Sequence, residues 1–326
     1  MMRLTAPGNQ RFAQAAGFDI TYGGGEANVA AALAGMGVPA SHVTVFPDND
    51  LGRSAAAFFQ KSGVDVRRMR FEGHRLGLYF MERGAAMRPG RVVYDRYDSA
   101  FARLDPAWFD WPEILAGARW FHWTGITPAI SAPAAAACLE AVKTARSMGI
   151  TVSTDVNYRR NLWQWGKTAR EVMPALTECC DIAICSAGDA ADIFGIAVDA
   201  KEADRFSASA AELMRRFPQL KNVISVRRED LSASHNRLTG LCFDGRNRIE
   251  SPVFDIDPIV DRIGGGDAFA AGYIYGALHF DDPARALAFA TAAAALKHTI
   301  EGDFNMVGAA EIIQVMQGDV SGRLLR

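Results

Sequence analysis

The stretch at 261–276, DRIGGGDAFAAGYIYG, holds the residues best suited to do chemistry. Gly264, Gly265 and Gly266 precede Asp267 and a run with helical composition. Because glycine has no Cβ, the backbone there can approach a ligand closely and present successive N–H groups to it. A helix beginning at Asp267 would add the positive end of its dipole, giving an anion site with a carboxylate at its rim. Phosphoryl transfer needs these groups, although a glycine turn with an aspartate helix cap has the same pattern.

A second junction between glycines and a helix lies at 23–37, GGGEANVAAALAGMG. Its spacing is not G-x-G-x-x-G and no acidic residue follows in the Rossmann position, which disfavours dinucleotide binding. Glu26 and Asn28 lie in the first turn of the expected helix, where they could hydrogen-bond the hydroxyl groups of a polyol. Alternatively, Glu26 simply favours the helix N-terminus.

The chain around these motifs alternates strands and helices from 120 to 304, with short apolar strands near 121–123, 150–153, 181–185 and 223–226. This alternation predicts an α/β fold with a doubly wound, mostly parallel central sheet flanked by helices. In such sheets ligands bind beyond the carboxyl ends of the strands. The motifs at 124–125, 155–159, 225–227 and 264–267 fall at those ends, so we expect them to converge on one site.

The segment 67–99 lacks the alternation of strands and helices. It contains short runs of alternating apolar and polar residues at 77–82 and 91–96, which Gly84 and Pro89-Gly90 separate. This pattern predicts a hairpin. With residues 10–22 it would form a small β-sheet lid within a single domain spanning 1–326. Its residues Tyr79, Tyr94 and Arg96 could select a carboxylate-bearing ligand. Taken alone, however, the segment favours a solvent-facing sheet with amphipathic tyrosines.

The composition limits the partners. The formal charge of −2 argues against a nucleic-acid or anionic-membrane surface. The five cysteines form no C-x-x-C pair and the six histidines are scattered, so we expect reduced thiols and no structural metal site. No charged start is followed by an apolar run, so the sequence predicts a cytoplasmic protein without a signal peptide.

The motifs GGGEANVA, TGITPAIS (124–131), DVNYR (155–159) and DRIGGGDAFAAGYIYG together resemble the ribokinase-like, phosphofructokinase B type carbohydrate kinases. The similarity runs through nearly the whole chain, including KHTIEGDFN at 297–305. DVNYR, TGITPA and the segment with Tyr94 and Arg96 are most similar to the branch that acts on 2-keto-3-deoxygluconate. The resemblance implies an ATP-dependent kinase that phosphorylates the 6-hydroxyl of this sugar acid.

The resemblance also implies roles for individual residues. Asp267 would take the proton from the hydroxyl, with Gly264, Gly265 and Gly266 as the anion hole and Arg159 bridging phosphate and substrate. We expect Asp267 to be a weak base, since a helix dipole favours its ionised form. The sugar acid would contact Gly24, Gly25, Asn28, Tyr79, Tyr94, Arg96, Arg159 and Asp303. The nucleotide would contact Asn157, Ser225, Arg227, Gly264 and Gly266.

The implied cofactors are ATP and Mg²⁺, with room for a monovalent cation. No protein group would bind the metal directly, and Asp189 could reach it through water. An exposed edge of the lid sheet favours a homo-oligomer.

Three features depart from the family pattern. Met2-Arg3-Leu4 resembles the end of the family's opening strand, whose first part is not in the sequence. Residues 186–189 read SAGD where the family has Asn-x-x-Glu. Residues 227–234 read RREDLSAS in place of a glycine-rich nucleotide loop.

Other functions are compatible with parts of this pattern. A kinase for another sugar, such as fructose or a related aldonate, would keep the glycine–aspartate loop. A non-catalytic sensor of a sugar acid or nucleotide would explain the shortened opening strand and the loss of Asn-x-x-Glu. The presence of Asp267, its glycines and Arg159 favours catalysis. A Rossmann dehydrogenase fits least well.

Overall fold

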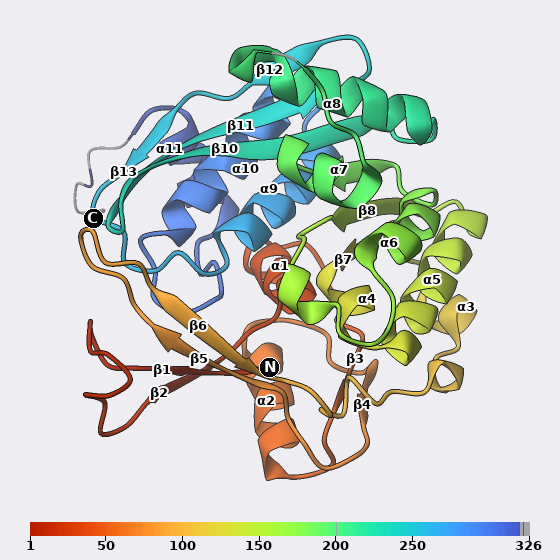
Figure 1. The fold of residues 1–326 in the computed structure, drawn as a ribbon, viewed down its shortest axis with the longest axis vertical. Helices are drawn as coiled ribbons and strands as arrows, with labels where there is room; N and C mark the ends of the chain where they lie inside the picture. Colours follow the sequence, from red (N-terminus) through yellow and green to blue (C-terminus); the bar gives the residue numbers. More distant parts are fainter. Residues whose placement is uncertain (200, 320–321, 323–326) are drawn as a thin grey trace.

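The computed structural model describes residues 1–199, 201–319 and 322. Its main strands are β7 (Trp120–Thr124), β8 (Thr151–Asp155), β9 (Ile182–Ile184), β10 (Asn222–Ser232), β11 (His235–Phe243), β12 (Arg248–Glu250) and β13 (Phe254–Ile256). They form a seven-stranded sheet in the order β12-β11-β10-β9-β8-β7, with β13 beside β11 (Figure 1). The strands from β7 to β10 are parallel, and β11 to β13 extend the sheet with antiparallel pairs.

Helices cover both faces of this sheet. One face carries α1 (Gly25–Gly35), α9 (Gly265–His279), α10 (Pro283–Lys297) and α11 (Ala309–Met316). The other carries α5 (Ala132–Ser147), α6 (Ala169–Thr177), α7 (Ala187–Phe194) and α8 (Glu202–Arg216). Neighbouring residues of β10 point to opposite cores, Val223 to one and Ile224 to the other, as expected for a strand buried on both faces. The expected doubly wound α/β fold is confirmed.

A second, four-stranded sheet contains β1 (Met2–Thr5), β2 (Asp19–Tyr22), β5 (Leu78–Glu82) and β6 (Arg91–Asp95) in the order β2-β1-β5-β6. We call it the small sheet. The antiparallel pairing of β5 with β6 confirms the expected hairpin. β1 belongs to this sheet although it lies outside the expected ranges 10–22 and 67–99, because it pairs with both β2 and β5.

β4 (Met69–Phe71) falls inside 67–99 but does not join the small sheet. It pairs in parallel with β3 (Thr44–Phe46) across α2 (Asp50–Lys61), forming a separate two-stranded sheet. No strand of the described residues connects this pair to β7. The remaining short helices are η1 (Pro106–Trp108), α3 (Trp111–Ile114), α4 (Ile126–Ile130) and η2 (Arg160–Leu162). Within the described ranges no helix combines the length and apolarity that crossing a membrane would require.

Candidate active site

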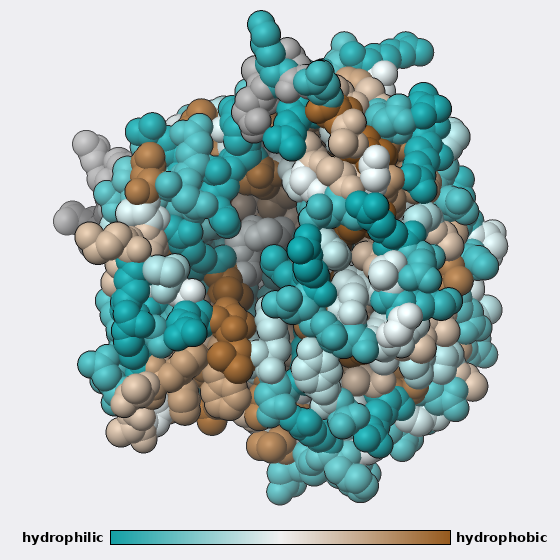
Figure 2. All heavy atoms as spheres, in the orientation of Figure 1, coloured by the Kyte–Doolittle hydropathy of each residue, from teal (hydrophilic) through white to brown (hydrophobic). Residues whose placement is uncertain are grey.

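A cavity of about 1620 Å³ lies where β7 and β8 end and α9 begins, bordered by the small sheet. Figure 2 shows the corresponding face hollowed between the small sheet and the main body. The volume exceeds the roughly 300–1,000 Å³ of an ordinary small-molecule pocket, so it has room for more than one ligand. Most predicted site residues line it: Gly24, Gly25, Asn28, Tyr79, Tyr94, Arg96, Asn157, Arg159, Asp189, Gly264, Gly265, Gly266, Asp267 and Asp303.

The glycine loop forms the start of α9. This helix begins at Gly265, two residues before the expected Asp267, and Gly264 precedes it with a left-handed φ of 83°. A Cβ on Gly264 would lie 2.0 Å from the carbonyl oxygen of Asp303, so a side chain cannot be accommodated there. A Cβ on Gly266 would meet no atom within 4 Å, so this part of the first turn is open to a ligand. The N–H groups in the first turn of a helix suit an anion.

Asp267 stands in the first turn of α9 and faces α1. Asn28 Nδ2 donates to Asp267 Oδ2 at 2.6 Å, and Gly24 N fixes the Asn28 amide by donating to its Oδ1 at 3.1 Å. Burial raises the pKa of Asp267 to about 7, with further upward contributions from Asp303 and Glu26, while the Asn28 bond lowers it. The expected weak base is therefore wrong: desolvation outweighs the helix terminus.

A buried ionic network supports the wall beside Asp267. Asp303 accepts hydrogen bonds from Arg3 Nη1 at 2.8 Å and from the Tyr79 hydroxyl at 2.6 Å. Arg3 also donates to Asp261 at 2.5 Å, and its side chain is only 1% exposed. Both predicted sugar contacts, Tyr79 and Asp303, thus bind each other. Sequence reasoning missed Arg3, whose only local signal is a charged residue within a short apolar strand.

Arg96 reaches the cavity from the loop after β6. Its side chain is buried, with the residue only 8% exposed, and its Nε has no hydrogen-bond partner. Among the described residues no carboxylate forms an ion pair with it. Burial lowers the pKa of this guanidinium, although the Tyr94 and Glu26 charges oppose the shift. A buried cation without a counter-ion is costly, so an anionic ligand would be stabilised here.

The end of β8 gathers further polar groups. Asn157 has a left-handed φ of 36° and donates its N–H to Asp155 Oδ1 at 3.1 Å. Burial raises the pKa of Asp155 to about 8, helped by the charges of Asp267 and Asp189 and opposed by Arg159. Asp189 also belongs to the capping box of α7, because its Oδ2 accepts the hydroxyl of the N-cap residue Ser186 at 2.7 Å. A carboxylate close to two others and an arginine is typical of functional sites.

Comparison with known proteins identifies this architecture. Residues 3–307 match the family model described as pfkB family carbohydrate kinase. The chain belongs to the pfkB family of carbohydrate kinases. It is 32% identical to a 2-dehydro-3-deoxygalactonokinase of Haloferax volcanii, over 99% of this chain and 96% of the relative. It is 28% identical to a 2-dehydro-3-deoxygluconokinase of Thermoproteus tenax, over 93% of this chain and 86% of the relative.

Solved structures agree with the family. A 2-dehydro-3-deoxygluconokinase of Thermotoga maritima superposes with a TM-score of 0.93 at 41% identity, covering 98% of this chain and 96% of that one. An ATP-bound fructokinase of Xylella fastidiosa, at 22% identity and a TM-score of 0.77, shares the fold. As a pfkB family kinase, the chain is an enzyme that phosphorylates a carbohydrate.

Two predicted nucleotide contacts of this kinase lie elsewhere. Ser225 and Arg227 do not line the cavity, whereas Val226, Arg228 and Asp230 do. The reason is that β10 continues to Ser232, so the expected loop at 227–234 is mostly strand. Alternate residues of a strand point to opposite faces, which turns 225 and 227 away from the cavity.

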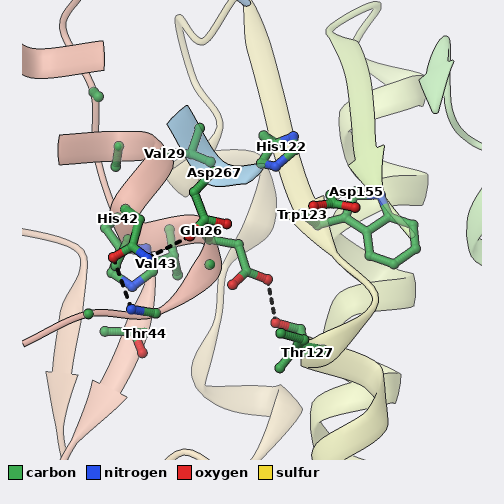
Figure 3. Close-up of a pocket in the computed structure, with 18 of the residues that line it drawn as sticks. Glu26, Val29, His42, Val43, Thr44, His122, Trp123, Thr127, Asp155 and Asp267 are labelled. Carbon is green, nitrogen blue, oxygen red and sulfur yellow. Dashed lines mark hydrogen bonds between the residues drawn. The ribbon is translucent and has the colours of Figure 1, made fainter. Parts of the chain in front are cut away.

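Glu26 forms hydrogen bonds within the protein, so it is not available for the predicted contact with a polyol. Its carboxylate accepts hydrogen bonds from Thr124 N, Thr124 Oγ1 and Thr127 Oγ1 at 2.6–3.0 Å; Figure 3 shows the bond to Thr127. The kinase thereby joins the first turn of α1 to the end of β7. Besides Arg3, sequence reasoning assigned no role to Arg228, whose side chain reaches the cavity only because β10 is long.

Proposed function

We propose that this kinase transfers a phosphoryl group from ATP to the 6-hydroxyl of 2-keto-3-deoxygluconate. Arg96 is the observation that carries the proposal, because a buried guanidinium without a carboxylate partner suits an acid substrate better than a neutral sugar. The names of relatives from Haloferax volcanii, Thermoproteus tenax and Thermotoga maritima support a 2-keto-3-deoxy sugar acid. The galactonate epimer is the second candidate, favoured by the Haloferax relative.

In the proposed mechanism the hydroxyl oxygen attacks the terminal phosphorus of ATP. A new O–P bond forms, the bond to the bridging oxygen breaks, and ADP leaves with that electron pair. Asp267 accepts the hydroxyl proton, and its pKa of about 7 suits a base at neutral pH. The N–H groups at the start of α9 would stabilise the charge on the transferring group, and Arg159, which also lines the cavity, would help to neutralise it.

The cavity residues fit a nucleotide with Mg²⁺. The described residues hold no cluster of three or more His, Cys, Asp or Glu side chains that could bind a metal. Mg²⁺ commonly keeps several waters and binds one or two carboxylates plus substrate phosphates. Asp155 and Asp189 are the carboxylates in position to do so, directly or through water, and Arg228 is a cation for the nucleotide side. Bound Mg²⁺ would supply charge neutralisation to the phosphates.

The test measures ADP release with ATP–Mg²⁺ and a panel of 2-keto-3-deoxygluconate, 2-keto-3-deoxygalactonate, gluconate, fructose and ribose. We expect turnover with a keto-deoxy acid, most efficiently the gluconate form, and a fall of at least ~10²-fold for Asp267→Ala. Preferred turnover of a neutral sugar would contradict the role of Arg96. No turnover with any substrate would favour a sensor.

The small sheet also suggests self-association. β6 is an edge strand, and Val92, Val93 and Tyr94 are 38–52% exposed on it; Figure 2 shows hydrophobic atoms over this region. Such an edge pairs readily with another strand. We expect a homodimer in sedimentation velocity that Val93→Glu converts to monomer, whereas Val253→Glu, at a comparably exposed position, does not. A monomeric wild type would exclude this interface.

A further inference from the structure

The last residue of α10, Lys297, has its side chain buried against the glycine loop. The residue is 0% exposed and is one of the largest side chains that the core encloses completely. Its Nζ donates to the Ile300 carbonyl at 2.9 Å, and within the described residues this is its one hydrogen bond. A buried ammonium is costly unless neighbouring groups compensate for its charge, so its position calls for a reason.

The glycine at 264 leaves room for this side chain. A Cβ on Gly264 would lie 3.2 Å from Lys297 Cε, as well as 2.0 Å from the Asp303 carbonyl oxygen. Lys297 does not line the cavity, whereas residues 264–267 do. The lysine therefore packs behind the glycine turn, on the side that faces away from a ligand.

Hydrogen bonds fasten together the two segments around Lys297. The His298 carbonyl accepts Val260 N at 2.8 Å and Asp261 N at 3.2 Å. Gly302 N donates to Asp261 Oδ2 at 3.2 Å. The loop before α9 is thus joined to the chain after α10, and the lysine side chain lies where they meet.

The charges near Lys297 explain how an ammonium is kept there. Burial lowers the pKa of Lys297, and the positive charge of Arg3 lowers it further. The carboxylates of Asp261, Asp303 and Asp267 oppose this shift and favour the charged form. Arg3 pairs with both Asp261 and Asp303, so one cation faces two anions, and Lys297 supplies the second positive charge. Without it, the wall behind the start of α9 would be negative and would repel a phosphoryl group.

Stabilisation of the end of α10 does not require this burial. A lysine in the last turn of a helix interacts favourably with the helix dipole from an exposed position. Long charged side chains usually extend their charged end into water. Lys297 is enclosed instead, which places its charge at the base of the glycine turn.

We propose that Lys297 is a positioning residue for phosphoryl transfer, whose ammonium behind Gly264 attracts the negative charge of the transferring group to the start of α9. The inference rests on the proposed function, in which this turn receives that group. Asp267 stands in the first turn of α9, so a group moving toward the hydroxyl that Asp267 deprotonates also moves toward Lys297. The attraction therefore grows along the reaction, and it acts through a protein interior where charges are weakly screened.

The hydrogen bond to Ile300 adds preorganisation. It holds the ammonium in place before the ligand arrives, so no rearrangement is needed when charge reaches the turn. Lys297 acts through the glycine turn and touches neither substrate nor nucleotide.

The test separates the charge of Lys297 from its hydrogen bond. Lys297→Gln keeps a donor for the Ile300 carbonyl and loses the charge, whereas Lys297→Met loses both. The matched control is Lys221→Gln, because Lys221 pairs with Asp181 at 3.0 Å with 71% of its side chain exposed. It does not line the cavity.

Kinetics are measured with ATP–Mg²⁺ and the sugar acid that the wild type turns over best. In both Lys297 variants we expect kcat and kcat/KM to fall together by about 10–100-fold, with KM nearly unchanged. The rising limb of the plot of kcat/KM against pH should also move to higher pH, since Asp267 loses a neighbouring positive charge that favours its ionised form. Lys221→Gln should match the wild type in both respects.

A second measurement uses binding instead of turnover. ADP–Mg²⁺ with aluminium fluoride mimics the transferring phosphoryl group. By calorimetry in the presence of the same sugar acid, both Lys297 variants should bind this combination at least ~10-fold more weakly than the wild type. Their affinity for ADP–Mg²⁺ alone should stay nearly the same.

Wild-type kcat in Lys297→Gln together with a loss in Lys297→Met would assign the effect to the Ile300 hydrogen bond and overturn the proposal. Weaker binding of ADP–Mg²⁺ alone, together with a lower urea midpoint, would also overturn it, because the role would then be structural. An inactive wild type would contradict the proposed function and this inference with it. An active wild type with equally active variants would contradict this inference alone.

Discussion

At the scale of single residues, the ionisation of Asp267 depends on opposing contributions. Burial and the neighbouring Asp303 and Glu26 raise the pKa of this carboxyl, whereas the Asn28 hydrogen bond and Arg159 lower it. The resulting pKa of about 7 makes this carboxylate basic enough to accept a proton. At neutral pH it is still ionised in much of the population. Asn28 is therefore a positioning residue that also tunes the base.

We predict that kcat/KM rises with pH as one group ionises near pH 7 and then levels off. Asn28→Leu removes the hydrogen bond that favours the carboxylate, so the rising limb of the plot of kcat/KM against pH should move to higher pH. Asn28→Asp serves as a second variant, because its added negative charge should move the limb in the same direction. An unchanged limb in both variants would assign the ionisation to another group, such as Asp155.

The same shift predicts how stability depends on pH. The folded pKa of Asp267 lies above its unfolded value of 3.8, so its contribution is fully present below pH 4 and lost as pH rises through about 7. Asp267→Asn cannot ionise, so its free energy of unfolding should fall less than that of the wild type between pH 4 and pH 8. Urea denaturation at several pH values checks this, and parallel curves would contradict it.

Arg96 supplies a test of acid recognition. Arg96→Leu should lower kcat/KM for the sugar acid by at least ~10²-fold, because breaking a buried charged pair costs on the order of 2–5 kcal/mol. Arg96→Lys should recover part of the loss, since lysine keeps the charge without the bidentate geometry. Equal losses for acid and neutral substrates would indicate a purely structural role.

At the scale of elements, the placement of Asp267 depends on the packing of α9 against α10. Glycines at 272 and 276 permit close contact: a Cβ on Gly272 would lie 2.7 Å from Ala290 Cα, and one on Gly276 equally close to Ala286 Cα. At the other end of α9, Gly264 lies against the chain after α10, where a Cβ would be 2.0 Å from the Asp303 carbonyl oxygen. Close backbone packing thus holds α9 in place, in addition to the Asn28 hydrogen bond to Asp267.

Gly272→Ala should therefore destabilise the protein by about 1–3 kcal/mol through overpacking, measured by urea denaturation. The matched control is Gly188→Ala in α7, where the nearest atom to a new Cβ is 3.6 Å away. Alanine there should be neutral or slightly stabilising. Similar effects at both positions would mean that close packing of α9 on α10 is unimportant.

At the scale of the whole molecule, Arg3 joins the small sheet to the main body. It belongs to β1, yet its partners Asp261 and Asp303 lie 258 and 300 residues away in the sequence. All three side chains are almost fully buried. The position of the small sheet over the cavity is therefore fixed by charge pairing as well as by strand pairing.

Arg3→Met should cost about 3–5 kcal/mol of unfolding free energy, because two buried carboxylates lose their partner. Arg67→Met is the control, since Arg67 forms its ion pair with Asp65 with 85% of its side chain exposed. That variant should leave the urea midpoint unchanged. A small effect of Arg3→Met would show that water or Lys297 compensates for the missing charge.

Features that depend on local chemistry could be predicted from the sequence. Strand and helix periodicity predicted the α/β fold, and the turn residues at 84 and 89–90 predicted the β5–β6 hairpin. Glycine runs marked the junctions at 23–25 and 264–266, because glycine is the residue type that lets the backbone approach another group closely. Carboxyl ends of parallel strands share an edge, so convergence of most site residues was also predictable.

Features that depend on residues distant in the sequence became visible in the folded chain. The pKa of Asp267 follows from burial, which helix position alone does not reveal. The register of β10 turns Ser225 and Arg227 away from the cavity. The polar residues at 227–232 have the composition of a loop, but they form a strand because β11 pairs with them. The partners of Arg3 come from segments far apart in the chain, whose contacts no local pattern encodes.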